Sequence, residues 1–327
     1  MSRPGQSSRL LICCTALIVC QFVSQLSQAG VIRDKLMERR AQQSEMEEEE
    51  AATNGPRFKL PPGTRVLEDV AYGSDAKQKM DVYLPASAGD HSAVRLPVIF
   101  MVHGGAWAIG SKTHNKVVEN KVARWLPKGF IFISINYRML PQLLAREQAE
   151  DVARALAMAQ SKAAEWGGDP DQFIIMGHSA GAHLISLLST SPDMVAQFGV
   201  HPWLGSVSLD SAAYDIPAIM ATKHYGFYDK AFGTDPAYWR RSSPLHALNT
   251  AGAPFLAVCS SKRPDHPCDQ ADYFVKRANA IGMRASVLPQ ARSHGDINQQ
   301  LGLENSYTQA VEDFMASLSP AIRRHLE

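Results

Sequence analysis

A pentapeptide with glycine at both ends, Gly177-His178-Ser179-Ala180-Gly181, separates an apolar run from a helical pattern. The run 173–176 is typical of a buried strand and 182–188 of a helix. A serine on such a tight strand-to-helix turn is a nucleophile elbow, where larger flanking side chains would collide with neighbouring strands. We therefore expect a strained Ser179 with its hydroxyl held out of the sheet, facing helix N–H groups that can bind an anion. The alternative is a glycine-rich helix start without chemistry.

Strand-like and helix-like stretches alternate along the chain, which predicts an α/β fold with a mostly parallel sheet covered by helices on both faces. The segments 65–72 and 80–84 are expected to form an antiparallel pair at a sheet edge. In such sheets the reactive groups gather beyond the carboxyl ends of the strands. Further strands are expected at 96–102, 130–135, 173–176, 204–209, 254–260 and 284–288, and helices at 115–126, 146–166, 182–188, 269–281 and 304–318.

The composition is that of a globular protein with material for one large core: 327 residues, 45% hydrophobic and 20% charged. A formal net charge of +1 gives no field that would recruit nucleic acid or an anionic membrane. Small-molecule chemistry is therefore the better expectation, although the sequence does not indicate an oligomeric state.

The N-terminus has the pattern of a secretory signal peptide, residues 1–29. Arg3 and Arg9 precede the apolar stretch 10–23, and 27–29 resembles a cleavage site. We expect an exported, periplasmic or secreted protein without stable membrane insertion, because an apolar stretch of 14 residues falls short of the roughly 20 that a span needs. A retained anchor is the alternative. Residues 30–62, polar and acidic, should form a linker, and 63–327 the catalytic domain.

Removal of the leader would leave two cysteines, Cys259 and Cys268. Export to an oxidising compartment makes a disulfide between them possible, and two free thiols are the alternative. The bridge would close a loop that carries Asp265.

A general base and an acid should accompany Ser179. His294 lies after the last expected strand, where its imidazole could take the proton of the Ser179 hydroxyl. The acid that orients His294 is predicted to be Asp265, in the loop after the strand that ends at Ser260. Asp210 is the main rival, and Asp269 is better explained as a helix N-cap.

The segment His103-Gly104-Gly105-Ala106 follows a central strand, and its glycines allow the backbone to approach a substrate closely. We predict that the N–H groups of Gly105, Ala106 and Ala180 form an oxyanion hole. The residues that flank the two motifs, Trp107 and His178, are expected to line the substrate pocket.

These motifs, with Asn136-Tyr137-Arg138 and 167–170, resemble the α/β-hydrolase superfamily, and more narrowly its HGG-motif serine esterases. That group contains hormone-sensitive-lipase-like, bacterial feruloyl-esterase-like and kynurenine-formamidase-like enzymes. The resemblance covers roughly 66–318 and implies an acyl-enzyme mechanism with Ser179, His294 and an acid after the penultimate strand. The chain departs from the group where many relatives have a glycine-acid turn before the acid, and where Ala106 replaces a third glycine.

The aromatic-rich segment 211–248 could be a lid over the strand ends, or equally a surface excursion packed on the helices below it. Taken together, the sequence predicts an α/β-hydrolase that cleaves a small-molecule carboxylic ester without metal or organic cofactor. One alternative is an amide or formamide hydrolase with the same residues. The other is a hydrolase-fold protein that binds without turnover.

Overall fold

The computed structural model describes residues 58–89 and 95–327. All the described residues belong to the second of the two units into which the chain divides, residues 48–327. The predicted signal peptide and most of the predicted linker lie outside the described residues. The last linker residues are not merely a spacer, however, because Phe58 and Leu60 pack against a hydrophobic core.

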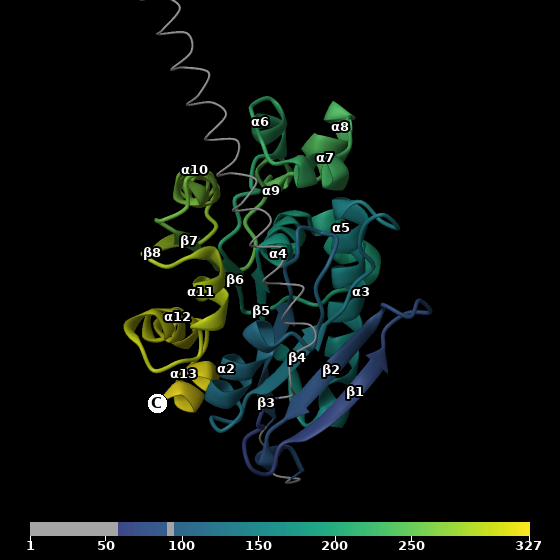
Figure 1. Ribbon diagram of the computed structural model, residues 1–327. Coiled ribbons are helices and arrows are strands. Elements are labelled where there is room, and N and C mark those ends of the chain that lie inside the picture. The colour runs from purple at the N-terminus through teal and green to yellow at the C-terminus, as the bar shows by residue number, and fades with distance from the viewer. Residues whose placement is uncertain (1–57, 90–94) are drawn as a thin grey trace, which may run out of the picture. The chain divides into compact units, whose positions relative to one another are not determined.

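The second unit is built on one eight-stranded sheet with the order β1-β2-β4-β3-β5-β6-β7-β8 (Figure 1). The first two strands pair antiparallel at one edge, as the sequence predicts, and β2 also pairs antiparallel with β4. From β4 to β8 in this order, all neighbouring strands pair parallel. The strands are β1 (Arg65–Ala71), β2 (Lys79–Leu84), β3 (Leu96–Val102), β4 (Ile131–Ile135), β5 (Gly168–His178), β6 (Gly205–Leu209), β7 (Phe255–Ser260) and β8 (Ala285–Gln290).

Helices cover both faces of this sheet, which is why its central strands are apolar throughout. In β3, Val98 and Phe100 pack into one core while Ile99 and Met101 pack into another on the opposite face. The first core includes residues of α3 (Ala145–Lys162), α4 (Ala180–Thr190) and α5 (Pro192–Phe198). The second includes residues of α2 (Asn115–Trp125), α11 (His294–Gln299), α12 (Ser306–Ala316) and α13 (Pro320–Leu326), and α10 (Pro267–Ala280) contributes to a third core.

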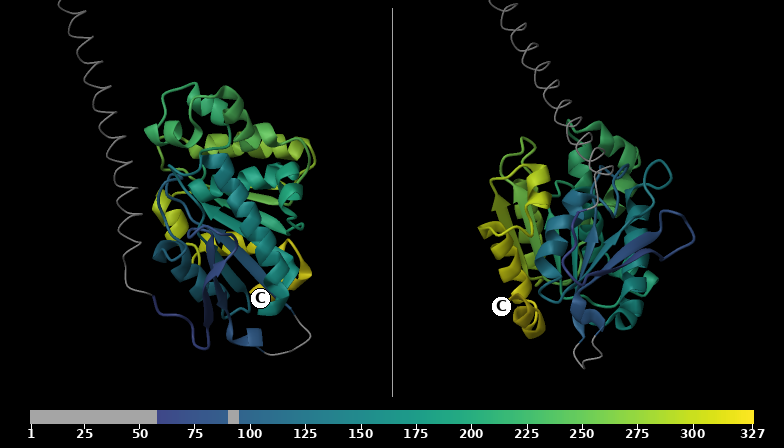
Figure 2. Two further views of the ribbon diagram at one scale, coloured as in Figure 1. Left: turned by 90° about the vertical axis from the view of Figure 1, so that its right-hand side faces the viewer. Right: turned by 60° about the horizontal axis from the view of Figure 1, so that its bottom comes forward.

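The segment 211–248 forms four short helices that Figures 1 and 2 show together at one end of the sheet. Its aromatic side chains are largely buried: Tyr214, Tyr228 and Phe232 are each less than 9% exposed. The Tyr238 hydroxyl donates to Glu147 of α3 at 2.7 Å. The helices are α6 (Ile216–Met220), α7 (Gly226–Phe232), α8 (Pro236–Arg241) and α9 (Pro244–Ala247).

Several elements differ from the sequence-based expectations. Strand β5 begins at Gly168, five residues earlier than expected, because Gly167 ends the preceding 3-10 turn in a left-handed conformation (φ 84°) and the chain turns at once. The structure also has short helices where the sequence predicted none, namely α5 to α9, α11 and α13. Of these, α11 directly follows β8, and the Ser293 side chain caps it by accepting from the N–H of Asp296. In the part of the chain that the structure describes, every helix is too short or too polar to cross a bilayer.

Candidate active site

Ser179 occupies the predicted elbow between β5 and α4. Its backbone has φ 54° and ψ −117°, a strained conformation for a residue with a side chain. The flanking glycines are required by close packing: a Cβ on Gly177 would lie 2.4 Å from the carbonyl oxygen of Gly181, and one on Gly181 would lie 2.3 Å from that of Val102. Ser179 is partly exposed although its neighbours on both sides are buried. The fold therefore presents this hydroxyl at the carboxyl end of β5.

The loop after β3 lies directly against the elbow. A Cβ on Gly104 would be 2.9 Å from the Ser179 Cβ, so only glycine permits this approach. The loop itself is strained, because Ala106 has φ 48° and Trp107 has φ 60°. Tyr137, from the Asn136-Tyr137-Arg138 motif, supports it by donating its hydroxyl to the His103 carbonyl at 3.0 Å.

The predicted oxyanion-hole donors are available in this arrangement. Within residues 58–89 and 95–327, the N–H groups of Gly105, Ala106 and Ala180 donate to no other protein atom. Ala180 is the first residue of α4, where the N–H groups of a helix lack partners within the helix. Free amides next to a strained serine can stabilise a negative charge that develops there.

His294 is the first residue of α11, the helix that follows β8. Its ring contacts that of His178, the residue before Ser179, with 4.5 Å between the ring centroids. The side chain is only partly buried. The sheet thus brings together His178 and His294, which lie 116 positions apart in the sequence, because β5 and β8 both end at this rim.

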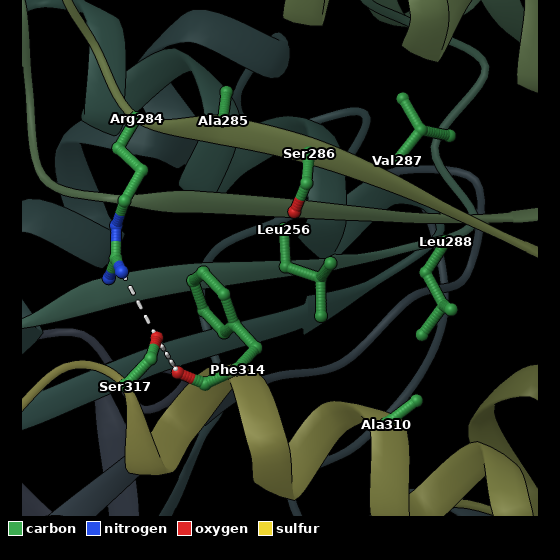
Figure 3. Close-up of a pocket in the computed structure, with 9 residues that line it drawn as sticks. All are labelled: Leu256, Arg284, Ala285, Ser286, Val287, Leu288, Ala310, Phe314 and Ser317. Carbon is green, nitrogen blue, oxygen red and sulfur yellow. Dashed lines mark hydrogen bonds between the residues drawn. The ribbon is translucent and has the colours of Figure 1, made fainter.

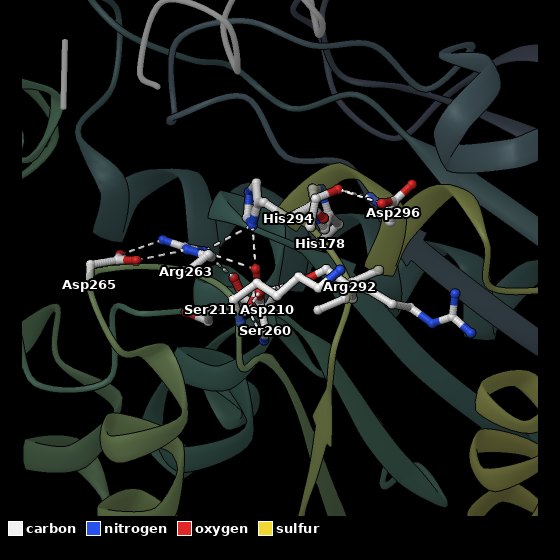
Figure 4. Close-up of polar contacts among 12 residues, drawn as sticks. His178, Asp210, Ser211, Ser260, Arg263, Asp265, Arg292, His294 and Asp296 are labelled. Atoms are coloured by element: carbon white, nitrogen blue, oxygen red, sulfur yellow. Dashed lines mark hydrogen bonds and ion pairs between the residues drawn. The ribbon is translucent and has the colours of Figure 1, made fainter. Parts of the chain in front are cut away.

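The carboxylate beside His294 is that of Asp210, so the prediction of Asp265 as the acid is wrong. Asp210 Oδ2 lies 2.6 Å from His294 Nδ1 (Figure 4). Asp265 instead forms a two-pronged ion pair with Arg263, at 2.9 and 2.5 Å, and the guanidinium stands between this carboxylate and the imidazole. Asp210 directly follows β6, the strand next to β5, and is itself strained (φ 58°).

Asp210 is buried but ionised. Burial raises the pKa of its carboxyl, yet the hydrogen bond with His294, the positive charge of Arg263 and the N–H of Ser260 together hold that pKa well below its ordinary value. A carboxylate at 2.6 Å requires a proton on His294 Nδ1, since two lone pairs would otherwise face each other. Nε2 is then the unprotonated nitrogen, which is the form a general base needs.

The two residues expected to line the pocket have supporting positions in the structure. Trp107 and His178 are both buried, and each is only 3% exposed. Trp107 donates to His183 Nδ1 at 3.2 Å and packs against Phe232. His178 Nε2 lies 3.1 Å from the His294 carbonyl oxygen, and burial together with the nearby His294 lowers the pKa of His178 well below its ordinary value. These contacts correct the expectation of pocket-lining side chains.

The loop that carries Arg263 and Asp265 is closed by a disulfide. The sulfur atoms of Cys259, in β7, and Cys268, in α10, are 2.03 Å apart. The bridge therefore ties the end of β7 to the start of α10, on either side of this loop.

Two further residues of the site have no sequence signal for their roles. An arginine beside a triad, such as Arg263, has no spacing signature, and Tyr137 is recognisable only as part of a motif. The sequence does carry a signal for Asp210, which directly follows β6, the strand adjacent to the elbow strand β5. Among the described residues there is no group of three or more His, Cys, Asp or Glu side chains that could hold a metal ion.

Comparison with known proteins places this site in a family. The family model described as BD-FAE matches residues 80–277. Esterase LipQ of Mycobacterium tuberculosis strain H37Rv is 27% identical over 291 residues, which are 82% of this chain and 68% of LipQ. A probable isoprenylcysteine alpha-carbonyl methylesterase, ICMEL1 of Oryza sativa subsp. japonica, is 32% identical over 121 residues, 37% of this chain and 27% of the relative.

Solved structures agree on the fold. Esterase B of Lactobacillus rhamnosis superposes with a TM-score of 0.66 at 18% identity, covering 89% of this chain and 95% of that one. At this identity the likeness concerns the fold, which is that of the α/β-hydrolases.

Proposed function

The chain belongs to the BD-FAE family, and we propose that this carboxylic ester hydrolase works through an acyl-enzyme formed on Ser179. The observation that carries the proposal is the convergence at one sheet rim of the strained Ser179, the His294–Asp210 pair and a loop with free amides. Each of these features costs stability, and strain and buried charge of this kind are typical of active sites.

In the first half of the reaction, the Ser179 hydroxyl attacks the ester carbonyl carbon while His294 Nε2 takes its proton. The resulting imidazolium is stabilised by the ionised Asp210. The carbonyl oxygen gains a negative charge, which is stabilised by hydrogen bonds donated by the N–H groups of Gly105, Ala106 and Ala180. Each such donor is worth roughly 2.7 to 4 kcal/mol of barrier.

In the second half, the tetrahedral intermediate collapses and the leaving alcohol takes the proton from His294. Ser179 then carries the acyl group. A water molecule attacks this acyl-serine while His294 takes its proton. The second tetrahedral intermediate then collapses, His294 returns the proton to the Ser179 oxygen, and the carboxylic acid leaves. The residues of the site supply all proton transfers in this cycle.

Turnover of a short-chain p-nitrophenyl ester tests the assignment. Ser179→Ala and His294→Ala should each reduce kcat by several orders of magnitude, because the three groups act as a unit. Near-normal rates in either variant would refute it. A panel of short acyl, long acyl, acetyl-sugar, feruloyl and formyl substrates then defines the ester, and preferential cleavage of the formyl amide would favour a formamide hydrolase.

We also propose export, which is supported by the leader pattern in 1–29 and by the disulfide, a bond that persists in oxidising compartments. Mass determination of the mature protein recovered outside the cytoplasm should give an N-terminus near Gly30. Recovery of the full-length chain from the cytoplasm would contradict export.

A further inference from the structure

Arg263 joins both carboxylates near the imidazole. Its Nη1 lies 3.0 Å from Asp210 Oδ2 and 2.9 Å from His294 Nδ1 (Figure 4). Its Nε and Nη2 bind the two oxygens of Asp265. The guanidinium side chain is 13% exposed, so water screens these interactions only weakly.

Arg263 Nη1 donates both of its hydrogens to Asp210. One is directed to Oδ2 and the other to the Asp210 carbonyl oxygen at 3.3 Å. Because His294 Nδ1 already carries its own proton toward Asp210, the contact between Arg263 and His294 is not a hydrogen bond. It is the close approach of a fixed positive charge to the ring that must gain a proton during catalysis.

We propose that Arg263, held by Asp265, is a positioning residue that fixes the Asp210 carboxylate and keeps His294 neutral at mildly acidic pH. The proposal rests on the proposed function, since it concerns His294 as the general base. Asp265 then acts indirectly, by orienting Arg263.

The sign of the effect follows from the charges around His294. Asp210 favours the imidazolium, whereas Arg263 disfavours it and also offsets the charge of Asp210. Removing Arg263 should therefore raise the proton affinity of His294. The other charged or titratable groups near the ring remain in every variant: His178 beneath it, Arg292 and Asp296 on its own segment, and Lys121 of α2, which binds Asn298.

The experiment is the pH profile of kcat/KM for a short-chain ester, whose acid limb reports the general base in the free enzyme. Arg263→Gln and Arg263→Met remove the charge, and Arg263→Lys keeps it. Arg284→Gln is the matched control: it removes one arginine at the opposite end of β8, where Figure 3 shows the guanidinium directed to Ser317.

In both neutral variants the acid limb should move to higher pH by about one unit, so that kcat/KM on the acid side falls about tenfold relative to the plateau. In Arg263→Lys the acid limb should stay within about 0.3 unit of the wild type, because the positive charge near the ring is kept. It should stay equally close in Arg284→Gln, because the charge of Arg284 is far from the ring.

An acid limb that does not move, or moves to lower pH, in a folded neutral variant would overturn the proposal. Unfolding of both neutral variants, judged by thermal melts, while Arg263→Lys folds would assign Arg263 to stability and also overturn it. Failure of the proposed function looks different: Ser179→Ala would then keep its activity, whatever the acid limb does.

Discussion

Replacement of Asp210 by asparagine removes a charge while keeping the shape of the side chain. In the wild type, Oδ2 accepts from His294 Nδ1 at 2.6 Å and Oδ1 accepts from the Ser260 N–H at 2.7 Å. An asparagine can offer an oxygen to only one of these two donors. In one orientation its NH2 group faces His294 and favours the wrong tautomer; in the other it faces the Ser260 N–H.

The expected loss in kcat is about 10⁴-fold, the cost of the wrong tautomer in a serine hydrolase triad. This corresponds to about 5.5 kcal/mol of barrier. The donor left without an acceptor costs a further ~1 to 3 kcal/mol of folding stability. The matched variant Asp265→Asn retains one of the two oxygens that accept from Arg263. We expect less than about a tenfold loss in kcat, since one weakened interaction costs about 1.4 kcal/mol or less.

Steady-state hydrolysis of a p-nitrophenyl ester, with thermal melts to verify folding, compares the two variants. Asp210→Asn should be the far more damaging change at every pH tested. Equal losses, or a greater loss in Asp265→Asn, would refute the assignment of Asp210 and return the role to the acid that the sequence favours.

Two further predictions concern the architecture around the site. Gly104→Ala should reduce kcat/KM at least ~100-fold, comparable to loss of an oxyanion donor, because the new Cβ would lie 2.9 Å from the Ser179 Cβ. Gly226→Ala is the control, since no atom lies within 4 Å of its new Cβ. Equal activity of the two variants would count against the loop geometry. Reduction of the Cys259–Cys268 bridge, which closes a loop of about ten residues, should lower the unfolding free energy by about 2.5 to 3 kcal/mol in denaturant titrations. An unchanged midpoint with reductant, or free thiols by mass spectrometry of the unreduced protein, would contradict a bridge.

The elements of the catalytic domain could be predicted because their signals are local. Strands such as β3 are apolar throughout since both faces are buried, and the elbow sequence is dictated by contacts that exclude any side chain at Gly177 and Gly181. His294 followed from topology alone, because it comes after the last strand of a parallel sheet.

The acid could not be predicted because it depends on side-chain pairing between loops. Asp210 and Asp265 both follow strands that end at the same rim. The sequence does not say which carboxylate will pair with His294 and which will bind Arg263 alone. The positions of Trp107 and His178 were misjudged for a related reason. Being adjacent to a catalytic motif does not determine whether a side chain faces a substrate or the packing below.

The central claim is that Ser179 is an activated nucleophile. Incubation of the folded wild-type protein with a fluorophosphonate probe, followed by peptide mass spectrometry, tests it most directly. We predict one covalent adduct per chain, on the peptide containing Ser179. The adduct should be absent in Ser179→Ala and should form much more slowly in His294→Ala. A folded wild-type protein that the probe does not modify, or modifies at another serine, would contradict it.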